Sequence, residues 1–572
     1  MCGIAGIIGE GNNDQLLLKM LNSQKHRGPD ATGEFYDRQG GAALGHNRLS
    51  IIDLSVEANQ PFHDASKRYS MVFNGEIYNY IELREELAQH YEFRTQSDTE
   101  VLLAAYKTWG KNCLSRLNGM FSFAIWDAKN QTFFAARDRF GVKPFNYSLK
   151  KNTLFFASEI KALHAAGIAK SPNLKVWASY FAYGSYGNPD ETFWDEVHQL
   201  PGGHYLEFSN GQLQISKWYF FEEEIKKQPT NLTHDQAKNH YLNLLKDSIK
   251  LRFRADVPVG FNISGGLDSS VLLAMVNDFD KGKSAINAYS FYTNNTDYDE
   301  ISWAESMIRN TKYPLHKILL EAKDVDPLSE KINFYQDEPF GGIPTLAYAK
   351  IFEQARKDGI KVLLEGQGMD EQWAGYDYYT QSNDITIQGV HVSPFKINML
   401  SEAFLKLAEK PVYPKLFRDE LLNKQYRDIF YTKIPRALRF NDRVSMAFST
   451  ELREPFLDYR LMEFAFSLPE DYKIKNGVTK FMLREIASEY LSDKLVFAEK
   501  RPLQTPQREW LAYDLKEWVG SCFDEIENSE YSNWFNKSEL RREWQTYQDG
   551  NIDSGFHIWQ CISLAEMIHN CK

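Results

Sequence analysis

A seven-residue stretch near the middle of the chain carries residue types that suit phosphate binding. It reads Ser-Gly-Gly-Leu-Asp-Ser-Ser at 264–270 and lies between two apolar runs, which predicts a strand, a tight turn and a helix start. The glycines let the backbone approach a polyanion, and Asp268 could hold Mg²⁺ against phosphate oxygens. The Gly-Lys-Ser at 282–284 does not form a Walker loop, because Asn277 stands where that motif needs its first glycine. The stretch at 264–270 has no such lysine and therefore suits pyrophosphate better than phosphoryl transfer. A Gly-Gly turn with a serine cap also occurs in βα units that bind no ligand.

A second set of residues, within the first hundred positions, could hydrolyse an amide. Removal of Met1 would leave Cys2 at the N-terminus, where its own α-amine can act as the general base that a thiol nucleophile needs. The same region supplies a guanidinium for a carboxylate, acidic groups for an ammonium, and an amide with a backbone N–H for an oxyanion. These are, in that order, Arg48, Asp98 or Glu76, and Asn74 with Gly75. Each of them alone could equally be a turn or cap residue.

The apolar runs that must position these residues predict two architectures. Hairpin-like runs at 121–126, 132–136 and 154–157 suit antiparallel sheets. Beyond residue 236 apolar strands and helices alternate, which predicts a parallel sheet with ligands at the carboxyl ends of its strands. Asp370 follows a strand-like run at 362–364 and is therefore the expected second carboxylate for Mg²⁺. Toward the C-terminus the pattern becomes mostly helical.

Length and composition limit the classes of protein. At 572 residues the chain is too long for one core, so two or more domains are expected. A net charge of −11 gives no footprint for nucleic acid or an anionic membrane, and no apolar run is long enough for a membrane span. The 5 cysteines are scattered without metal-ligand spacing, which favours a reducing compartment. We expect a cytoplasmic protein with neither nucleic acid nor membrane as a partner.

Several motifs in order resemble one family. The block from residue 1 to about 163, including 137–144, resembles the class II, N-terminal-nucleophile glutamine amidotransferase domain. Amidotransferases that make phosphoribosylamine or glucosamine 6-phosphate begin in the same way, but their second domains differ. Residues 264–270 look like the pyrophosphate loop of ATP-pyrophosphatases. Together with 441–446 and 451–458, they make the second half similar to that of the glutamine-hydrolysing asparagine synthetases.

The resemblance implies a mixed fold, α+β in the first half and α/β in the second. Residues 1–210 would form a four-layer αββα amidotransferase domain, and 211–235 a connecting segment. Residues 236–572 would form an ATP-pyrophosphatase domain of the asparagine synthetase type, like that of adenine nucleotide α-hydrolases, with a parallel sheet and a helical C-terminal part. Whether the chain forms a homodimer stays open.

The resemblance also implies a glutamine-dependent amide ligase that uses ATP and Mg²⁺. Glutamine would be hydrolysed to ammonia, ATP would adenylate an acceptor carboxylate and release pyrophosphate, and ammonia would displace AMP. Cys2 would be the nucleophile, and Lys480 would offset charge on the transferring phosphate and the departing pyrophosphate. The family's other roles fall on residues for glutamine and its oxyanion (Arg48, Asn74, Gly75, Glu76, Asp98), ATP (Ile263, Ser264, Gly265, Gly266, Asp268, Ser269, Phe291, Glu365, Gly366), the acceptor or its intermediate (Gln367) and Mg²⁺ (Asp268, Asp370).

The acceptor is left open by one segment. Asparagine synthetases usually read Ser-Gly-Glu-Gly-Ser-Asp-Glu where this chain has Glu-Gly-Gln-Gly-Met-Asp-Glu at 365–371. Gln367 keeps the size of the family's glutamate but cannot pair with an ammonium or act as a base, whereas Glu365 brings a carboxylate two residues away. Tyr292 and residues 500–503 also depart from the family's pattern. We expect aspartate as the acceptor, giving asparagine. The alternatives are a sugar uronic acid or a cell-wall amino acid, or a glutaminase or binding protein with an inactive synthetase domain.

Overall fold

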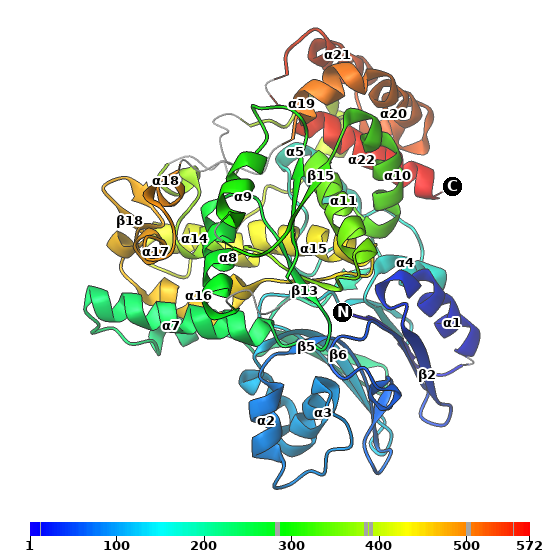
Figure 1. Ribbon diagram of the computed structural model, residues 1–572. Coiled ribbons are helices and arrows are strands. Elements are labelled where there is room, and N and C mark those ends of the chain that lie inside the picture. The colour runs from blue at the N-terminus through cyan, green and yellow to red at the C-terminus, as the bar shows by residue number, and fades with distance from the viewer. Residues whose placement is uncertain are drawn as a thin grey trace.

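The computed structural model describes residues 1–11, 13–280, 286–309, 311–381, 387, 393–498, 505–552 and 554–571. Residues 500–503, which depart from the family's pattern, lie outside this description. Figure 1 shows the N-terminal half below a larger C-terminal half, with the N-terminus itself near the centre of the molecule. No helix among the described residues is long and apolar enough to cross a membrane.

Two antiparallel six-stranded sheets face each other in the N-terminal half. The first has the order β10 (His198–Gln199), β8 (Asn146–Lys150), β9 (Thr153–Ala157), β1 (Gly3–Ile8), β3 (Ala42–Arg48), β2 (Ala31–Asp37). The second has the order β12 (Gln212–Lys217), β11 (His204–Ser209), β7 (Thr132–Arg137), β6 (Gly119–Asp127), β5 (Tyr69–Ile77), β4 (Phe62–His63). Alternate side chains of both sheets, among them Leu44, Val72 and Phe156, form the core between them.

Helices cover the two outer faces of this pair of sheets. Helices α1 (Asp14–Ser23) and α4 (Ile160–Ala165) pack on the first sheet, whereas α2 (Tyr80–Leu87) and α3 (Asp98–Trp109) pack on the second (Figure 1). The expected four-layer αββα arrangement is therefore present. The second sheet continues beyond residue 210, because β12 lies inside the segment 211–235 that we expected to be a connection.

A five-stranded parallel sheet forms the centre of the C-terminal half. Its order is β15 (Leu315–Leu319), β14 (Ala288–Tyr292), β13 (Val259–Asn262), β16 (Val362–Leu364), β17 (Glu451–Arg453). Helices lie on both faces, and include α7 (His234–Arg252), α8 (Leu267–Asp280), α9 (Ile301–Ile308), α11 (Ile343–Lys357) and α15 (Lys433–Met446). Beyond the sheet the chain is mainly helical, with α20 (Lys516–Asn528), α21 (Lys537–Gln548) and α22 (Phe556–Cys571) at the top of Figure 1. The expected α/β architecture with a helical C-terminal part is confirmed.

Strand β17 lies where the two halves meet. It pairs in parallel with β16 through Val362 and Glu451 at one end and Leu364 and Arg453 at the other. All three residues of β17 are buried. A strand this short has no readable alternation, and the sequence pattern did not predict it. It brings residues from the C-terminal half to the start of β1.

Candidate active sites

Cys2 precedes the central strand of the first sheet. Strand β1 is buried at every position because it has a neighbour on both sides and lies beneath helix α1. The backbone N–H of Cys2 donates to Oδ1 of Asn74 at 2.9 Å, and its Sγ lies 3.9 Å from the carbonyl oxygen of Leu49. Burial raises the pKa of the Cys2 thiol. The thiol is therefore protonated at neutral pH and needs a base to become a nucleophile.

Asn74 and Gly75 lie beside Cys2 on strand β5. Because Oδ1 of Asn74 accepts from Cys2, its amide nitrogen points elsewhere, and that Nδ2 has no hydrogen-bond partner among the described residues. Gly75 has φ +151°, and a Cβ there would lie 2.1 Å from the carbonyl oxygen of Met120. Only glycine fits this position. The structure thus brings together the three residues predicted for nucleophile and oxyanion.

Two of the residues predicted to hold glutamine's α-groups, Arg48 and Asp98, contact different parts of the N-terminal half. Arg48 donates to the carbonyl oxygens of Ser55, at 2.6 Å, and Asp53, and to Oδ1 of Asn59 at 2.8 Å, so it secures the loop after β3. Asp98 links the start of helix α3 to the end of strand β5, because its carboxylate accepts from the N–H of Ile77 at 2.9 Å.

Glu76 and Asp98 form a buried acidic pair on the same side. Burial raises the pKa of Asp98 to about 6, and burial also raises the pKa of Glu76, with the nearby carboxylates of Glu451 and Asp98 adding to the effect. A site with several buried carboxylates favours a cationic ligand. Two carboxylates in this setting could accept an ammonium.

Two residues of β17 join this acidic pair, and sequence reasoning missed both. The ammonium of Met1 contacts Oε2 of Glu451 at 2.7 Å, and Nε of Arg453 contacts Oε1 of Glu451 at 2.5 Å. Nη2 of Arg453 lies 3.7 Å from Oε2 of Glu76. Glu451 is 450 positions from Met1, and Arg453 is nearly 380 positions from Glu76. No local sequence pattern could therefore have placed them together.

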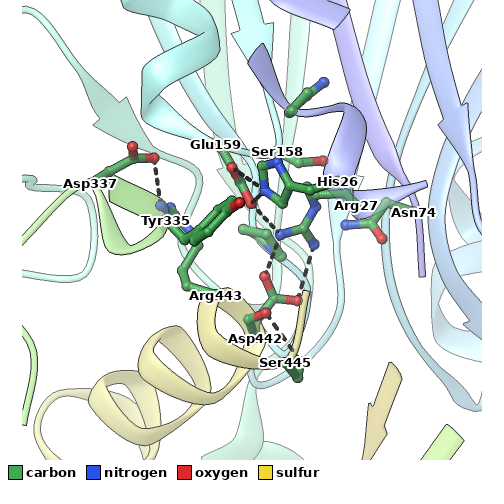
Figure 2. A network of polar contacts seen from close by, with 12 residues as sticks. His26, Arg27, Asn74, Ser158, Glu159, Tyr335, Asp337, Asp442, Arg443 and Ser445 are labelled. Carbon is green, nitrogen blue, oxygen red and sulfur yellow. Dashed lines mark hydrogen bonds and ion pairs between the residues drawn. The ribbon is translucent and has the colours of Figure 1, made fainter. Parts of the chain in front are cut away.

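Arg27 links the backbone of Cys2 to the C-terminal half (Figure 2). Its Nε donates to the carbonyl oxygen of Cys2 at 3.0 Å. Its Nη1 contacts Glu159 at 2.9 Å and Asp442 of helix α15 at 2.8 Å, and all of these groups are buried. Figure 2 shows Arg27 between the two carboxylates, with Asn74 to one side. No role for Arg27 was predicted from the sequence, and its partners lie too far away along the chain to be predicted.

The phosphate-binding stretch connects β13 to α8 as predicted. Gly265 has φ +79°, and a Cβ there would lie 2.8 Å from Cβ of Trp303. The hydroxyls of Ser269 and Ser270 both donate to the carbonyl oxygen of Gly266, at 3.2 and 2.7 Å. Helix α8 begins at Leu267, so its first N–H groups face the loop. This turn is shaped to bring backbone N–H groups close to an anion.

Lys480 lies between the two predicted Mg²⁺ carboxylates. Its Nζ contacts Oδ1 and Oδ2 of Asp268 at 2.6 and 2.7 Å, and Oδ1 of Asp370 at 2.8 Å. Burial opposes the charge of Lys480, but Asp268 and Asp370 outweigh it and raise the pKa of the ammonium. A Cβ on Gly375 would lie 2.0 Å from Asp370 and 2.3 Å from Lys480, so glycine is required beside them. The three charged groups predicted from distant segments meet at one point.

Polar donors surround the Glu365 carboxylate at the carboxyl end of β16. It is buried, and its Oε1 accepts from the hydroxyl of Tyr348 at 2.6 Å and from Nδ2 of Asn262 at 3.3 Å. Its Oε2 accepts from Nδ2 of Asn441 at 3.2 Å, and Gln367 donates to the same carboxylate. Burial raises the pKa of Glu365. The extra carboxylate of this chain is therefore held beside Gln367, in the segment that departs from the family's pattern.

Comparison with known proteins divides the chain at about the same place as its sheets do. The family model described as a glutamine amidotransferase domain matches residues 1–219, and the one described as asparagine synthase matches residues 240–569. "Asparagine synthetase [glutamine-hydrolyzing] 1" of Bacillus subtilis (strain 168) is 28% identical, with 98% of this chain and 95% of the relative covered. "Asparagine synthetase [glutamine-hydrolyzing] 3" of the same organism is 30% identical, with 91% and 89% covered. "Amidase chry2" of Gibberella zeae is 26% identical, with 99% and 97% covered.

Proposed function

The chain belongs to the glutamine-hydrolysing asparagine synthetase family, and on this basis we propose that it is an ATP-dependent amide ligase with two active sites. One observation carries the proposal: both predicted sets of catalytic groups meet in buried clusters. Cys2 lies against Asn74 in the N-terminal half, and Lys480 lies between Asp268 and Asp370 in the C-terminal half. These intact clusters argue against a binding protein with an inactive synthetase domain.

Glutamine is hydrolysed at Cys2. Once Met1 has been removed, the α-amine of Cys2 takes the thiol proton, and Sγ attacks the side-chain amide carbon of glutamine. The oxyanion that forms accepts from the unpartnered Nδ2 of Asn74 and from the backbone at Gly75. The proton returns to the leaving nitrogen as ammonia departs, and water then hydrolyses the thioester to glutamate. Arg48, Glu76 and Asp98 hold the α-groups of glutamine.

ATP and the acceptor carboxylate meet at the carboxyl ends of β13, β14 and β16. The turn after β13 (Ile263, Ser264, Gly265, Gly266, Ser269) binds the phosphates, and Phe291, Glu365 and Gly366 line the nucleotide site. The acceptor carboxylate attacks the α-phosphorus, and pyrophosphate leaves. Lys480 stabilises the charge that grows on the phosphate oxygens. Ammonia then attacks the acyl carbon and AMP leaves, because AMP is a far better leaving group than hydroxide.

Mg²⁺ fits the carboxylates at this site. Asp268 and Asp370 converge on one cation, Nζ of Lys480, which stands where both carboxylates can reach. One or two carboxylates together with substrate phosphates are the usual ligands of Mg²⁺. When bound, Mg²⁺ would neutralise charge on the pyrophosphate. Asp268 and Asp370 would hold the ion, and Lys480 would remain beside them to contact the transferring phosphate.

We propose aspartate as the acceptor, because relatives of the asparagine synthetase name match along almost the whole chain. The observation that favours another carboxylate, such as a sugar uronic acid or a cell-wall amino acid, is the pocket around Glu365. Glu365 and Gln367 replace the family's serine and glutamate and contact each other. A relative named as an amidase, from Gibberella zeae, matches this chain over almost its whole length.

Pyrophosphate release with a panel of acceptors tests the function. We expect glutamine, ATP and aspartate to give AMP, pyrophosphate and a new amide in equal amounts. Stimulation by a uronic acid and none by aspartate would replace the acceptor and leave the ligase mechanism standing. No pyrophosphate with any carboxylate would contradict the ligase.

Cys2→Ala separates the two half-reactions. The variant is expected to lose glutamine hydrolysis while it still makes the amide from added ammonium. Retention of Met1, checked by mass spectrometry, is expected to act in the same way. Glutamine hydrolysis at the wild-type rate by Cys2→Ala would show that another residue is the nucleophile.

A further inference from the structure

The acidic cluster near Cys2 is built by both halves of the molecule. Glu76 and Asp98 come from the N-terminal half, and Glu451 and Arg453 from β17 of the C-terminal half. Glu451 and Arg453 have no exposed side-chain surface. Arg453 holds Oε1 of Glu451, so Oε2 is the oxygen that remains available to another cation.

The cluster contains two buried polar atoms that form no hydrogen bond. Oε2 of Glu76 and Nη2 of Arg453 form no hydrogen bond with any described residue, and they lie 3.7 Å apart. Buried polar groups are nearly always paired, because an unpaired one retains the full cost of leaving water. The two atoms form a long ion pair with each other, so each keeps a hydrogen-bonding capacity that a ligand with charged groups could use.

An ammonium already shows where the positive end of that ligand fits. The amine of Met1 contacts Oε2 of Glu451 at 2.7 Å, with both groups fully buried. Its charge also acts on Glu76, where it favours the ionised carboxylate. Met1 itself is packed among Leu49, Ile51 and Met120. Removal of Met1 would vacate this space and take the Met1 ammonium away from Oε2 of Glu451. The new α-amine forms at Cys2, whose nitrogen contacts Oδ1 of Asn74.

We infer that Glu451 is a glutamine-binding residue supplied by the C-terminal half, which accepts the α-ammonium of glutamine beside Glu76 and Asp98. Arg453 is a positioning residue that fixes the Glu451 carboxylate. The inference rests on the proposed function, because it takes Cys2 as the nucleophile and Met1 as removed. Glutamine is then bound across the junction of the two halves.

Glutamine and an analogue without its α-amine, 4-carbamoylbutanoate, test this inference. Ammonia release is measured without ATP or acceptor, on protein whose N-terminal Cys2 has been verified. For Glu451→Gln we expect kcat/KM for glutamine to fall about tenfold or more, the loss expected for a charge-assisted hydrogen bond. The kcat/KM for the analogue should stay within about twofold, because it has no ammonium to lose.

Two further variants keep the test decisive. Glu451→Asp retains the charge and should recover part of the preference for glutamine, and it replaces Glu451→Gln if that variant does not fold. Glu82→Gln removes an exposed ion pair between the halves, where Arg254 contacts both carboxylate oxygens at 2.6 and 2.7 Å, and should leave both substrates unchanged.

Equal losses for the two substrates, or no loss for either, would overturn the inference. Both outcomes presuppose a wild-type enzyme that hydrolyses glutamine. A wild-type enzyme that releases no ammonia from glutamine would instead contradict the proposed function.

Discussion

Lys480 shows how a single residue can combine a structural and a catalytic task. Its Nζ neutralises Asp268 and Asp370, which would otherwise repel each other in a buried site. In the proposed mechanism the same cation would stabilise charge on the phosphate oxygens. The residue itself has φ +56°, a strained conformation that surrounding contacts must maintain.

Replacing Lys480 with Ala is therefore expected to affect chemistry more than binding. We expect kcat for AMP formation to fall on the order of 10²-fold or more, because one transition-state contact is lost. Affinity for ATP, measured by equilibrium binding, should change far less. Glutamine hydrolysis serves as the internal control, since Cys2 is remote from this change. A loss of ATP affinity with unchanged kcat would make Lys480 a binding residue only.

The proposed role of Asp98 in binding the ammonium of glutamine predicts that glutamine hydrolysis depends on pH. Burial raises the pKa of Asp98 to about 6, so the carboxyl gains a proton as the pH falls through 6 and loses the charge that an ammonium needs. We expect kcat/KM for glutamine to fall below about pH 6, by up to about tenfold per pH unit. Above pH 6 the Asp98 carboxylate is ionised and no longer contributes to the pH dependence.

The variant Asp98→Asn tests this origin of the pH profile. Its kcat/KM should be lower at neutral pH and should no longer decline through pH 6. Amide synthesis from ammonium, recorded over the same range, should keep the wild-type profile. A decline through pH 6 that persists in Asp98→Asn would assign the titration to another group.

At the scale of elements, strand β5 is fixed by a close approach to β6. Gly75→Ala would place a Cβ 2.1 Å from the carbonyl oxygen of Met120, at a φ of +151°. We expect a loss of about 2–5 kcal/mol in the free energy of unfolding from strain and overpacking. Glutamine hydrolysis should be lost as well.

Gly110→Ala is the matched control for Gly75→Ala. Gly110 has φ +56°, but a Cβ there meets nothing within 4 Å. We expect its cost to be about 1–2 kcal/mol, from the backbone alone. Urea unfolding of the two variants compares them directly, and equal costs would contradict a steric role for Gly75.

Much of this arrangement could be predicted from the sequence because its signals are local. The Gly-Gly turn, the alternation of strands and helices and the apolar hairpins each occupy a short window, and the structure has them where they were expected. Strand β17 and the contacts of Glu451 could not be predicted in this way. Three residues carry no period, and the Met1–Glu451 contact joins positions 450 apart. The hydrogen-bond partners of Glu365 could not be predicted either, because the donors Asn262, Tyr348 and Asn441 come from three separate segments.

At the scale of the whole molecule, buried ion pairs hold the two halves together. Arg27 contacts Glu159 in its own half and Asp442 in the other (Figure 2). Asp442→Asn would leave the guanidinium with less compensation in a dry interface. We expect a loss of about 3–5 kcal/mol in the free energy of unfolding, as for other buried pairs that lose one partner.

Asp442→Asn should also lower the rate of glutamine-dependent synthesis. Arg27 also holds the carbonyl oxygen of Cys2, so Asp442→Asn should lower glutamine-dependent synthesis more than synthesis from ammonium. Glu82→Gln, which breaks an exposed pair between the halves, should cost no more than about 1 kcal/mol. Equal effects of the two substitutions on stability would argue against a central role for the buried network.

Strand β17 runs from the proposed glutamine site to the proposed acceptor site and would couple binding of the two substrates. Its first residue, Glu451, lies at the proposed glutamine site. The carbonyl oxygen of its last residue, Arg453, accepts from the N–H of Glu365 at 3.0 Å, about 7 Å further along at the usual rise of a strand. If filling the acceptor pocket shifts β17, the dissociation constant of glutamine changes by some factor. By reciprocity glutamine must then change the acceptor's dissociation constant by the same factor. Calorimetry on Cys2→Ala, which binds glutamine without consuming it, can measure both factors, and with Glu451→Gln added both should approach one.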